Sequence, residues 1–138
     1  MAILVDTSAI VALVDAADDD HQEVAHYVMN TEDVLLVPVT VLPEADYLIA
    51  ERVGVRGELA LLQDIVAGGL GLESVTVADV ARSAELINQH ADSDIGFVDA
   101  SIVAVAERLA ITHILTLDRR HFGMLRPRHC SSFTLVPA

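Results

Sequence analysis

Short apolar runs and amphipathic stretches alternate along the whole chain. Each apolar run is brief and ends at a turn or polar residue, a pattern typical of the buried strands of a parallel sheet. The runs predict strands at residues 2–5, 35–39, 72–75, 113–117 and 133–136. The stretches between them predict helices at residues 8–16, 21–30, 40–53, 58–67, 76–89 and 97–110, with a short helical turn after Asp118.

Local signals set several of these boundaries. Thr40 is expected to cap the helix that reaches residue 53, and Gly54 and Gly57 are expected to interrupt the chain after it. Thr76 and Asp79 have the spacing of a capping box, in which each side chain bonds the other residue's backbone N–H. Strands that alternate with helices in this way predict an α/β fold, with three α/β/α layers and a mainly parallel central sheet.

Length and composition limit the architecture further. The 138 residues suit one domain spanning residues 1–138, and 53% apolar residues indicate a folded globule. The first apolar run has no basic flank, and no run approaches the roughly 20 residues of a membrane-spanning helix. The lone Cys130 has no partner for an internal disulfide and is expected to be inert. We therefore expect a cytoplasmic protein in a reducing compartment, with no membrane association.

The charge of the chain bears on its chemistry. The net charge is −13, the sequence contains no Lys, and Arg52 and Arg56 are the two basic residues among thirteen acids in residues 1–69. Such a chain does not attract nucleic acid by net charge. Most of these acids are expected on a solvated surface, but some could gather divalent cations, which reverse the local sign of the charge.

Two of the acids directly follow apolar strands. Asp6 comes after residues 2–5, and Asp118 comes after residues 113–117. Either could simply cap the helix that follows. Ligands of open parallel sheets, however, bind beyond the carboxyl ends of the strands, and two strands that deliver an Asp to one edge favour a binding site there.

Two further acids join them in the predicted arrangement. Asp99 shares a face of its helix with Val103, Ala106 and Ala110, the face expected to pack inward. It is either a first-turn acid favoured by the helix dipole or a buried carboxylate that needs a partner such as a metal ion. Glu44 lies in the first turn of the helix that follows residues 35–39, again near the carboxyl edge of the sheet.

Four converging carboxylates repel one another unless a cation neutralises them. Oxygen ligands in that number suit Mg²⁺ or Mn²⁺, and one ion or a pair could assist phosphodiester cleavage. Thr7, Ser8 and Thr116 could orient water or phosphate. Two alternatives remain: a phosphoryl-transfer enzyme that uses Asp6, which usually also needs a Lys, and a binding module without catalytic activity.

Three ordered motifs resemble those of the PIN domain, and more narrowly those of VapC-type ribonuclease toxins from bacterial toxin–antitoxin pairs. The motifs are residues 3–8 (ILVDTS), residues 97–100 (FVDA) and residues 115–122 (LTLDRRHF). Each is short, but their order and spacing cover nearly the whole chain. Pro43 before Glu44 is not something the family pattern requires.

The resemblance implies a fold, a site and partners. It implies that Asp6, Glu44, Asp99 and Asp118 form a catalytic metal site, with Asp6 and Asp99 as the surest ligands of Mg²⁺ or Mn²⁺. It also implies RNA cleavage, homodimerisation and silencing by a cognate VapB-type antitoxin. His21 matches a family position of structural type, and Asp94 competes with Asp99 for its role. From position alone, His121 could orient the acids, and Arg119 and Arg120 either contact phosphate or are simply solvated.

Overall fold

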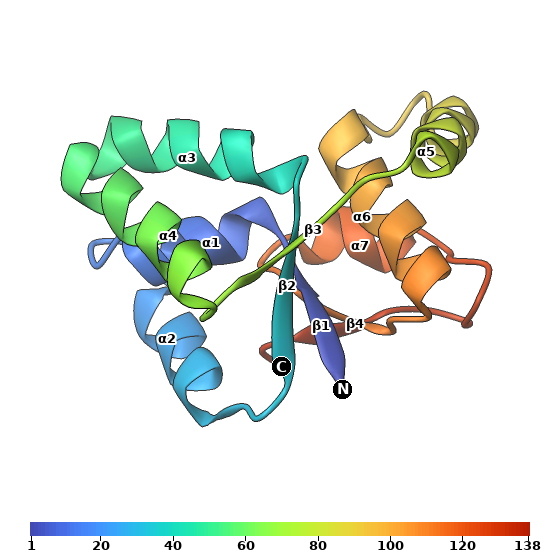
Figure 1. Cartoon of the computed structure of the whole chain (residues 1–138). Coiled ribbons are helices and arrows are strands. Elements are labelled where there is room, and N and C mark those ends of the chain that lie inside the picture. The colour runs from blue at the N-terminus through green and yellow to red at the C-terminus, as the bar shows by residue number, and fades with distance from the viewer.

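The computed structural model describes residues 1–138, and Figure 1 labels its elements. The strands are β1 (Ala2–Val5), β2 (Val34–Pro38), β3 (Gly71–Glu73), β4 (His113–Leu115) and β5 (Thr134–Val136). The helices are α1 (Thr7–Val14), α2 (His21–Asn30), α3 (Val41–Arg52), α4 (Val55–Ala67), α5 (Val77–Gln89), α6 (Phe97–Leu109) and α7 (Arg119–Met124).

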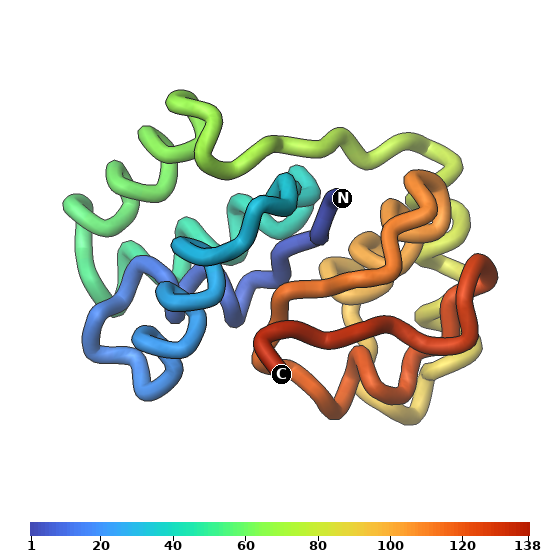
Figure 2. Tube along the Cα trace, turned by 90° about the horizontal axis from the view of Figure 1, so that it is seen from below, coloured from blue at the N-terminus to red at the C-terminus, as the bar shows by residue number.

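The five strands form one sheet in the order β3-β2-β1-β4-β5, and every pairing is parallel. Figure 2 shows the first strand in the middle of the molecule and the last segment of the chain running beside β4. The strand order runs outward from β1 to β3 and then returns to the other side of β1. Because parallel crossovers are right-handed, this reversal places the two sets of helices on opposite faces of the sheet.

Figure 1 shows this arrangement, with α1–α4 on one side of the sheet and α5–α7 on the other. The predicted α/β/α architecture is thus confirmed, and the sheet is wholly rather than mainly parallel. A cluster of 28 buried apolar residues forms the core, to which β1 contributes Ile3, Leu4 and Val5. The strands are near-continuous apolar runs because helices cover both faces of the sheet. None of the helices has the length and apolarity needed to cross a bilayer.

Several predicted helix boundaries differ from the structure, and α1 ends at Val14 rather than at residue 16. Helix α4 begins at Val55 and runs through Gly57, which does not interrupt it. A Cβ at Gly57 would lie within 3 Å of side-chain atoms of Val53 and Ile49, so this glycine permits a close corner between α3 and α4. Helix α6 ends at Leu109, and Ala110 adopts a left-handed φ of 56° instead of joining the inward face.

Thr40 occupies the predicted N-cap position of α3 but does not cap it with its side chain, whereas the predicted capping box of Thr76 and Asp79 is confirmed. The Thr40 side chain makes no capping bond, and its Oγ1 lies 2.6 Å from Ser101 Oγ on α6. Ser101 Oγ donates to Val98 O, so the Thr40 hydroxyl is the donor of the shared bond. This bond joins the start of α3 to α6, the two helices that carry Glu44 and Asp99.

Ion pairs attach α5 to α6. Arg82 donates from Nε to Glu107 Oε1 at 2.8 Å, and both side chains are 11% exposed. Arg108 donates from Nε to both oxygens of the buried Asp79. Burial alone would raise the pKa of Glu107, but bonds from Arg82 and the Arg128 backbone hold it below its usual value. These contacts stabilise the outer side of α6, whose first turn carries Asp99.

Candidate active site

A pocket of about 590 Å³ opens at the carboxyl edge of the sheet. It lies beyond β1 and β4, the neighbouring strands between which the strand order reverses, where open α/β sheets bind ligands. All four predicted acids line this pocket, together with two more. The six carboxylates are those of Asp6, Asp18, Glu44, Asp94, Asp99 and Asp118.

Asp6 occupies the N-cap position of α1 and is only 4% exposed. Its side chain makes no capping bond, so the helix-cap explanation does not account for it. Instead, Oδ2 accepts hydrogen bonds from Thr116 Oγ1 at 2.8 Å and from Ser8 Oγ at 3.0 Å. Both hydroxyls therefore orient one carboxylate oxygen and leave Oδ1 free of them.

The backbone fixes the direction of these two hydroxyl groups. Ser8 Oγ accepts from the Leu117 N–H at 3.0 Å, and Thr116 Oγ1 accepts from the Asp118 N–H at 2.9 Å. Each hydroxyl proton is thereby left to bond Asp6. Burial raises the pKa of the Asp6 carboxyl, and the bonds from Thr116 and Ser8 offset part of that rise.

Asp99, in the first turn of α6, has a side chain that is 20% exposed. Burial first, and then the negative field of Asp6, raise its pKa to about 6, with smaller contributions from Asp118 and Glu44 and an opposing one from His121. The positive end of a helix dipole favours the charged form of a first-turn acid. The rise in pKa shows that burial and repulsion outweigh the dipole at Asp99.

Glu44 and Asp94 lie at more exposed positions of the same pocket. Glu44 is exposed in the first turn of α3 and contributes to the negative field at Asp99. Asp94 sits in the loop before α6 with a left-handed φ of 57°. Glu44 and Asp94 both line the pocket. Asp94 therefore lies in the same pocket as Asp99, in the loop before the helix that carries Asp99.

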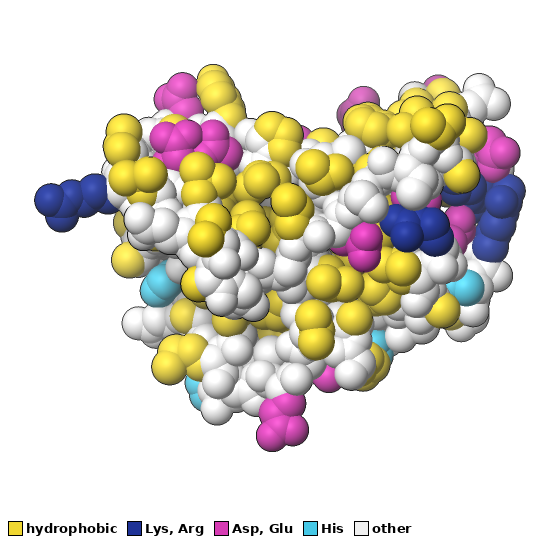
Figure 3. Space-filling view, in the orientation of Figure 1, with side chains coloured by type: hydrophobic (Ala, Val, Ile, Leu, Met, Phe, Trp, Pro, Cys, Tyr) yellow, Lys and Arg dark blue, Asp and Glu magenta, His cyan; other side chains and the backbone are white.

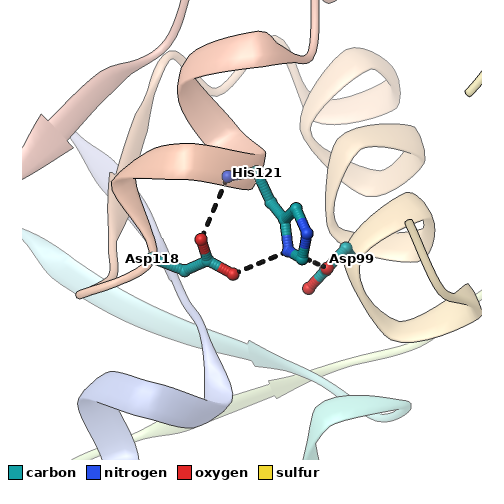
Figure 4. Close-up of side chains that lie close together, drawn as sticks. All are labelled: Asp99, Asp118 and His121. Atoms are coloured by element: carbon teal, nitrogen blue, oxygen red, sulfur yellow. Dashed lines mark hydrogen bonds and ion pairs between the residues drawn. The ribbon is translucent and has the colours of Figure 1, made fainter. Parts of the chain in front are cut away.

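His121 lies between two of the acids (Figure 4). Its Nδ1 is 2.8 Å from Asp118 Oδ2 and 3.3 Å from Asp99 Oδ2, within ion-pair distance of both. Neither approach has hydrogen-bond direction, and both ring nitrogens are buried without a hydrogen-bond partner. The His121 backbone N–H donates to Asp118 Oδ1 at 3.0 Å, which makes Asp118 the cap of α7 as well as a pocket acid.

Sequence reasoning gave His121 only a secondary place, because the histidines lack metal-ligand spacing. Ligand atoms of Asp99, Asp118 and His121 nevertheless lie within 4.8 Å of one another, a separation that one metal ion could bridge. Asp6 and Glu44 line the same pocket outside this compact set. The signal for His121 was its position three residues after Asp118 in a helical turn, where side chains share a face.

Taken together, the site can bind a cation. Buried and partly buried carboxylates crowd one pocket, so each raises the energy of its neighbours' charged forms. An oxygen-rich donor set with one imidazole beside it suits a hard divalent ion such as Mg²⁺ or Mn²⁺. Thr7 also lines the pocket, and its buried Oγ1 has no hydrogen-bond partner within the protein.

Comparison with known proteins gives consistent matches. The model of the PIN domain family matches residues 3–124. The chain is 41% identical over 135 residues to Ribonuclease VapC26 of Mycobacterium tuberculosis, covering 98% of this chain and 100% of that protein.

Solved structures share the fold. The crystal structure of VapC20 of Mycobacterium tuberculosis, a sarcin–ricin loop cleaving toxin, has a TM-score of 0.80 at 27% identity, covering 86% of this chain and 92% of that chain. DNA-bound VapBC from Salmonella typhimurium gives 0.69 at 13% identity, covering 98% of this chain and 96% of that chain. Because its acids gather in one pocket and the family model spans most of its length, this chain belongs to the PIN domain family, among the VapC-type ribonucleases.

Proposed function

We propose that this chain, as a single domain of residues 1–138, is a metal-dependent endoribonuclease that acts as the toxin of a toxin–antitoxin pair. In this proposal Asp6, Glu44, Asp99 and Asp118 hold Mg²⁺ or Mn²⁺ and form the catalytic site. The observation that carries it is the crowding at Asp99. There, burial and the field of neighbouring acids raise the pKa to about 6, a penalty that a bound cation would remove.

The residues present fit such an ion. The pocket offers carboxylate oxygens from the starts of four helices, α1, α3, α6 and α7, which is the donor chemistry of Mg²⁺ and Mn²⁺. An ion held there supplies a Lewis acid for the phosphodiester and positive charge for the transition state. The buried His121 ring, with no hydrogen-bonded nitrogen, lies in the same cluster and is a further candidate ligand or proton carrier.

The protein's own side chains perform distinct tasks. Thr116 and Ser8 hold the Asp6 carboxylate in one orientation, so it need not reorganise when substrate arrives. Asp99 and Asp118 both lie within ion-pair distance of the same His121 nitrogen, so the ring links the two carboxylates. The exposed Glu44 extends the acidic surface to the rim of the pocket.

The proposed partners are RNA, a VapB-type antitoxin and a second copy of this chain, all in the cytoplasm. Apolar side chains gather over α3, α4 and α5 on the face shown in Figure 3. Val66 and Val77 are each 88% exposed and Leu72 is 50% exposed, a concentration of apolar surface that favours protein contacts. Such contacts would cover this surface in the homodimer or in the complex with antitoxin.

The two alternative functions have less support. A phosphoryl acceptor reacts through one carboxylate oxygen, and at Asp6, which is 4% exposed, two hydroxyls engage Oδ2 and leave only Oδ1 for that role. The chain also lacks a Lys to hold the phosphate. A binding module without activity would leave the crowded acids unexplained, since uncompensated buried charge is costly.

Cleavage of defined RNAs tests the proposal. Antitoxin-free protein should cut total tRNA, ribosomal RNA or a hairpin carrying the sarcin–ricin loop in Mg²⁺ or Mn²⁺, and should stop when a chelator is added. The Asp6→Asn and Asp99→Asn variants should be inactive, whereas Asp92→Asn, an exposed acid outside the pocket, should cut like the parent. If all these RNAs stay intact with either metal, the ribonuclease proposal is wrong.

A further inference from the structure

The pocket contains two side chains that the acidic chemistry does not use. Among its sixteen lining residues, Arg52 is the only Arg or Lys and Phe97 is the only Phe, Tyr or Trp. A ribonuclease must hold its substrate as well as cut it, and six carboxylates around the pocket repel phosphate. A bound cation offsets this repulsion at the metal site, and other side chains of the pocket can add affinity for the rest of the RNA.

Phe97 is exposed where phenylalanine is usually buried. It is 43% exposed, whereas Phe122 and Phe133 are 1% and 7% exposed. Phe97 is the first residue of α6, two positions before Asp99, and its near neighbours Ile95 and Ala100 are buried in the core. The aromatic face is thus left at the pocket, next to the acids, although the adjoining residues pack inward.

Arg52 is the last residue of α3 and shares a helical face with Glu44 and Leu48, at spacings of four. The rise of an α-helix places Arg52 about 12 Å along the axis from Glu44. Figure 1 shows that α3 runs from the middle of the molecule away from α6. Arg52 therefore lies beyond Glu44 along α3, beside Asp18 and away from Phe97 at the start of α6.

The ion pair that Arg52 makes in the structure leaves most of its hydrogen-bond donors unused. Its Nη1 lies 3.5 Å from Asp18 Oδ2, and the Arg52 side chain is 51% exposed. The Asp18 side chain is 16% exposed, but an ion pair with one half-exposed partner at that distance is weak. The guanidinium group keeps free donors in a planar fork that matches the oxygens of a phosphate. A phosphate can therefore bind Arg52 without first displacing a strong bond.

We infer that Phe97 and Arg52 are substrate contacts on either side of the proposed metal ligands Asp6, Glu44, Asp99 and Asp118. Phe97 stacks on an unpaired base, and Arg52 binds a backbone phosphate. This inference rests on the proposed ribonuclease function and assigns two side chains that bind its RNA substrate. Single-stranded segments expose base faces to aromatic rings, whereas duplex RNA does not. The combination therefore favours loops and single strands over helices.

Binding and cleavage by matched variants test both contacts. Affinity is measured by fluorescence anisotropy with a fluorescein-labelled single-stranded RNA and with its duplex, in Ca²⁺, and a gel checks that the RNA stays intact. Phe97→Ala should weaken single-strand binding by about 5- to 100-fold and leave duplex binding unchanged, because base–aromatic stacking is lost. Phe97→Trp should retain the affinity. Tyr47→Ala, at the other exposed aromatic residue and outside the pocket, is the control.

For Arg52 the readout is the salt dependence. Arg52→Gln should lower the slope of log affinity against log salt by about 0.7, the value for one phosphate contact on a single strand, and Arg52→Lys should keep most of that slope. Arg56→Gln, at an exposed arginine outside the pocket, should leave the slope unchanged. In Mg²⁺ both Phe97→Ala and Arg52→Gln should raise KM more than they lower kcat.

The outcomes separate this inference from the function on which it rests. If the parent cleaves RNA while Phe97→Ala and Arg52→Gln bind and cleave like their controls, the contacts are wrong and the nuclease stands. If the predicted losses of binding appear but the parent cuts no RNA, the contacts stand and the proposed activity is wrong. Phe97 and Arg52 are exposed side chains, so unchanged thermal unfolding should accompany either result.

Discussion

Replacing Asp99 by Asn should make the metal-free protein more stable at neutral pH. Burial and neighbouring acids raise the pKa of Asp99 from 3.8 to about 6, so the folded protein disfavours the ionised carboxylate. A pKa raised on folding contributes stability that is full below pH 3.8 and is lost as the pH rises through about 6. Asn carries no charge and is free of this loss.

The size of the effect follows from the change in pKa. About two pKa units at about 1.4 kcal/mol each correspond to roughly 3 kcal/mol in the free energy of unfolding. The Asp99 side chain is 20% exposed, and solvent screening lowers the expected gain to about 2–3 kcal/mol. Parent and variant should be equally stable below pH 4, diverge between pH 4 and 6, and differ by a constant amount above that range.

Urea unfolding at a series of pH values, in chelator, measures this difference. Saturating Mn²⁺ should reverse the order, because an ion that binds the folded parent stabilises it while the variant has lost a ligand. The exposed Asp92→Asn should give the same stability as the parent throughout. If Asp99→Asn is less stable than the parent at pH 7 in chelator, or if its gain does not depend on pH, the crowding at this site has been misread.

Three further substitutions test individual contacts. Thr116→Val should lower the free energy of unfolding by about 1.5–3 kcal/mol and weaken Mn²⁺ binding in calorimetry, because the buried hydroxyl that donates to the Asp6 carboxylate is lost. Thr116→Ser should retain most of the stability and of the Mn²⁺ affinity. Equal Mn²⁺ affinity in the two variants would contradict the orienting role. Glu107→Gln should lower the free energy of unfolding by about 2–3 kcal/mol near pH 7, because it breaks the ion pair with Arg82. This difference from the parent should disappear as the pH falls through the lowered pKa of Glu107 in urea unfolding. A loss of stability independent of pH would exclude the ion pair as its cause. Ala110→Gly should raise the free energy of unfolding by about 0.5–1 kcal/mol in thermal unfolding, because glycine adopts the left-handed φ of 56° without strain. A loss of stability would show that packing of the alanine methyl group outweighs the backbone strain.

Much of the fold and the placement of the four acids in one pocket were predictable because their signals are local. The apolar runs marked all five strands to within two residues at either end, and the capping box placed the start of α5. Asp6 and Asp118 directly follow their strands along the chain. In a parallel sheet the carboxyl ends of adjacent strands share one edge, so periodicity alone brought these two acids to one place.

Other features depend on residues that are distant in sequence. Thr40 has the sequence position of a helix cap, but its hydroxyl donates a hydrogen bond to Ser101, 61 residues away. Gly57 looked like a helix breaker, yet it fills a corner against side chains of the preceding helix. His121 gained its place from Asp99, which lies on another helix.

The electrostatic state of the site was likewise beyond the sequence. The residue types and their spacing determined that acids would gather at the carboxyl edge of the sheet. Only the tertiary structure decided how deeply each acid is buried, which hydroxyls orient Asp6 and how strongly the others act on Asp99. The reason is physical: periodicity and capping act within a few residues of the chain, whereas desolvation and charge repulsion depend on distances through space that packing alone sets.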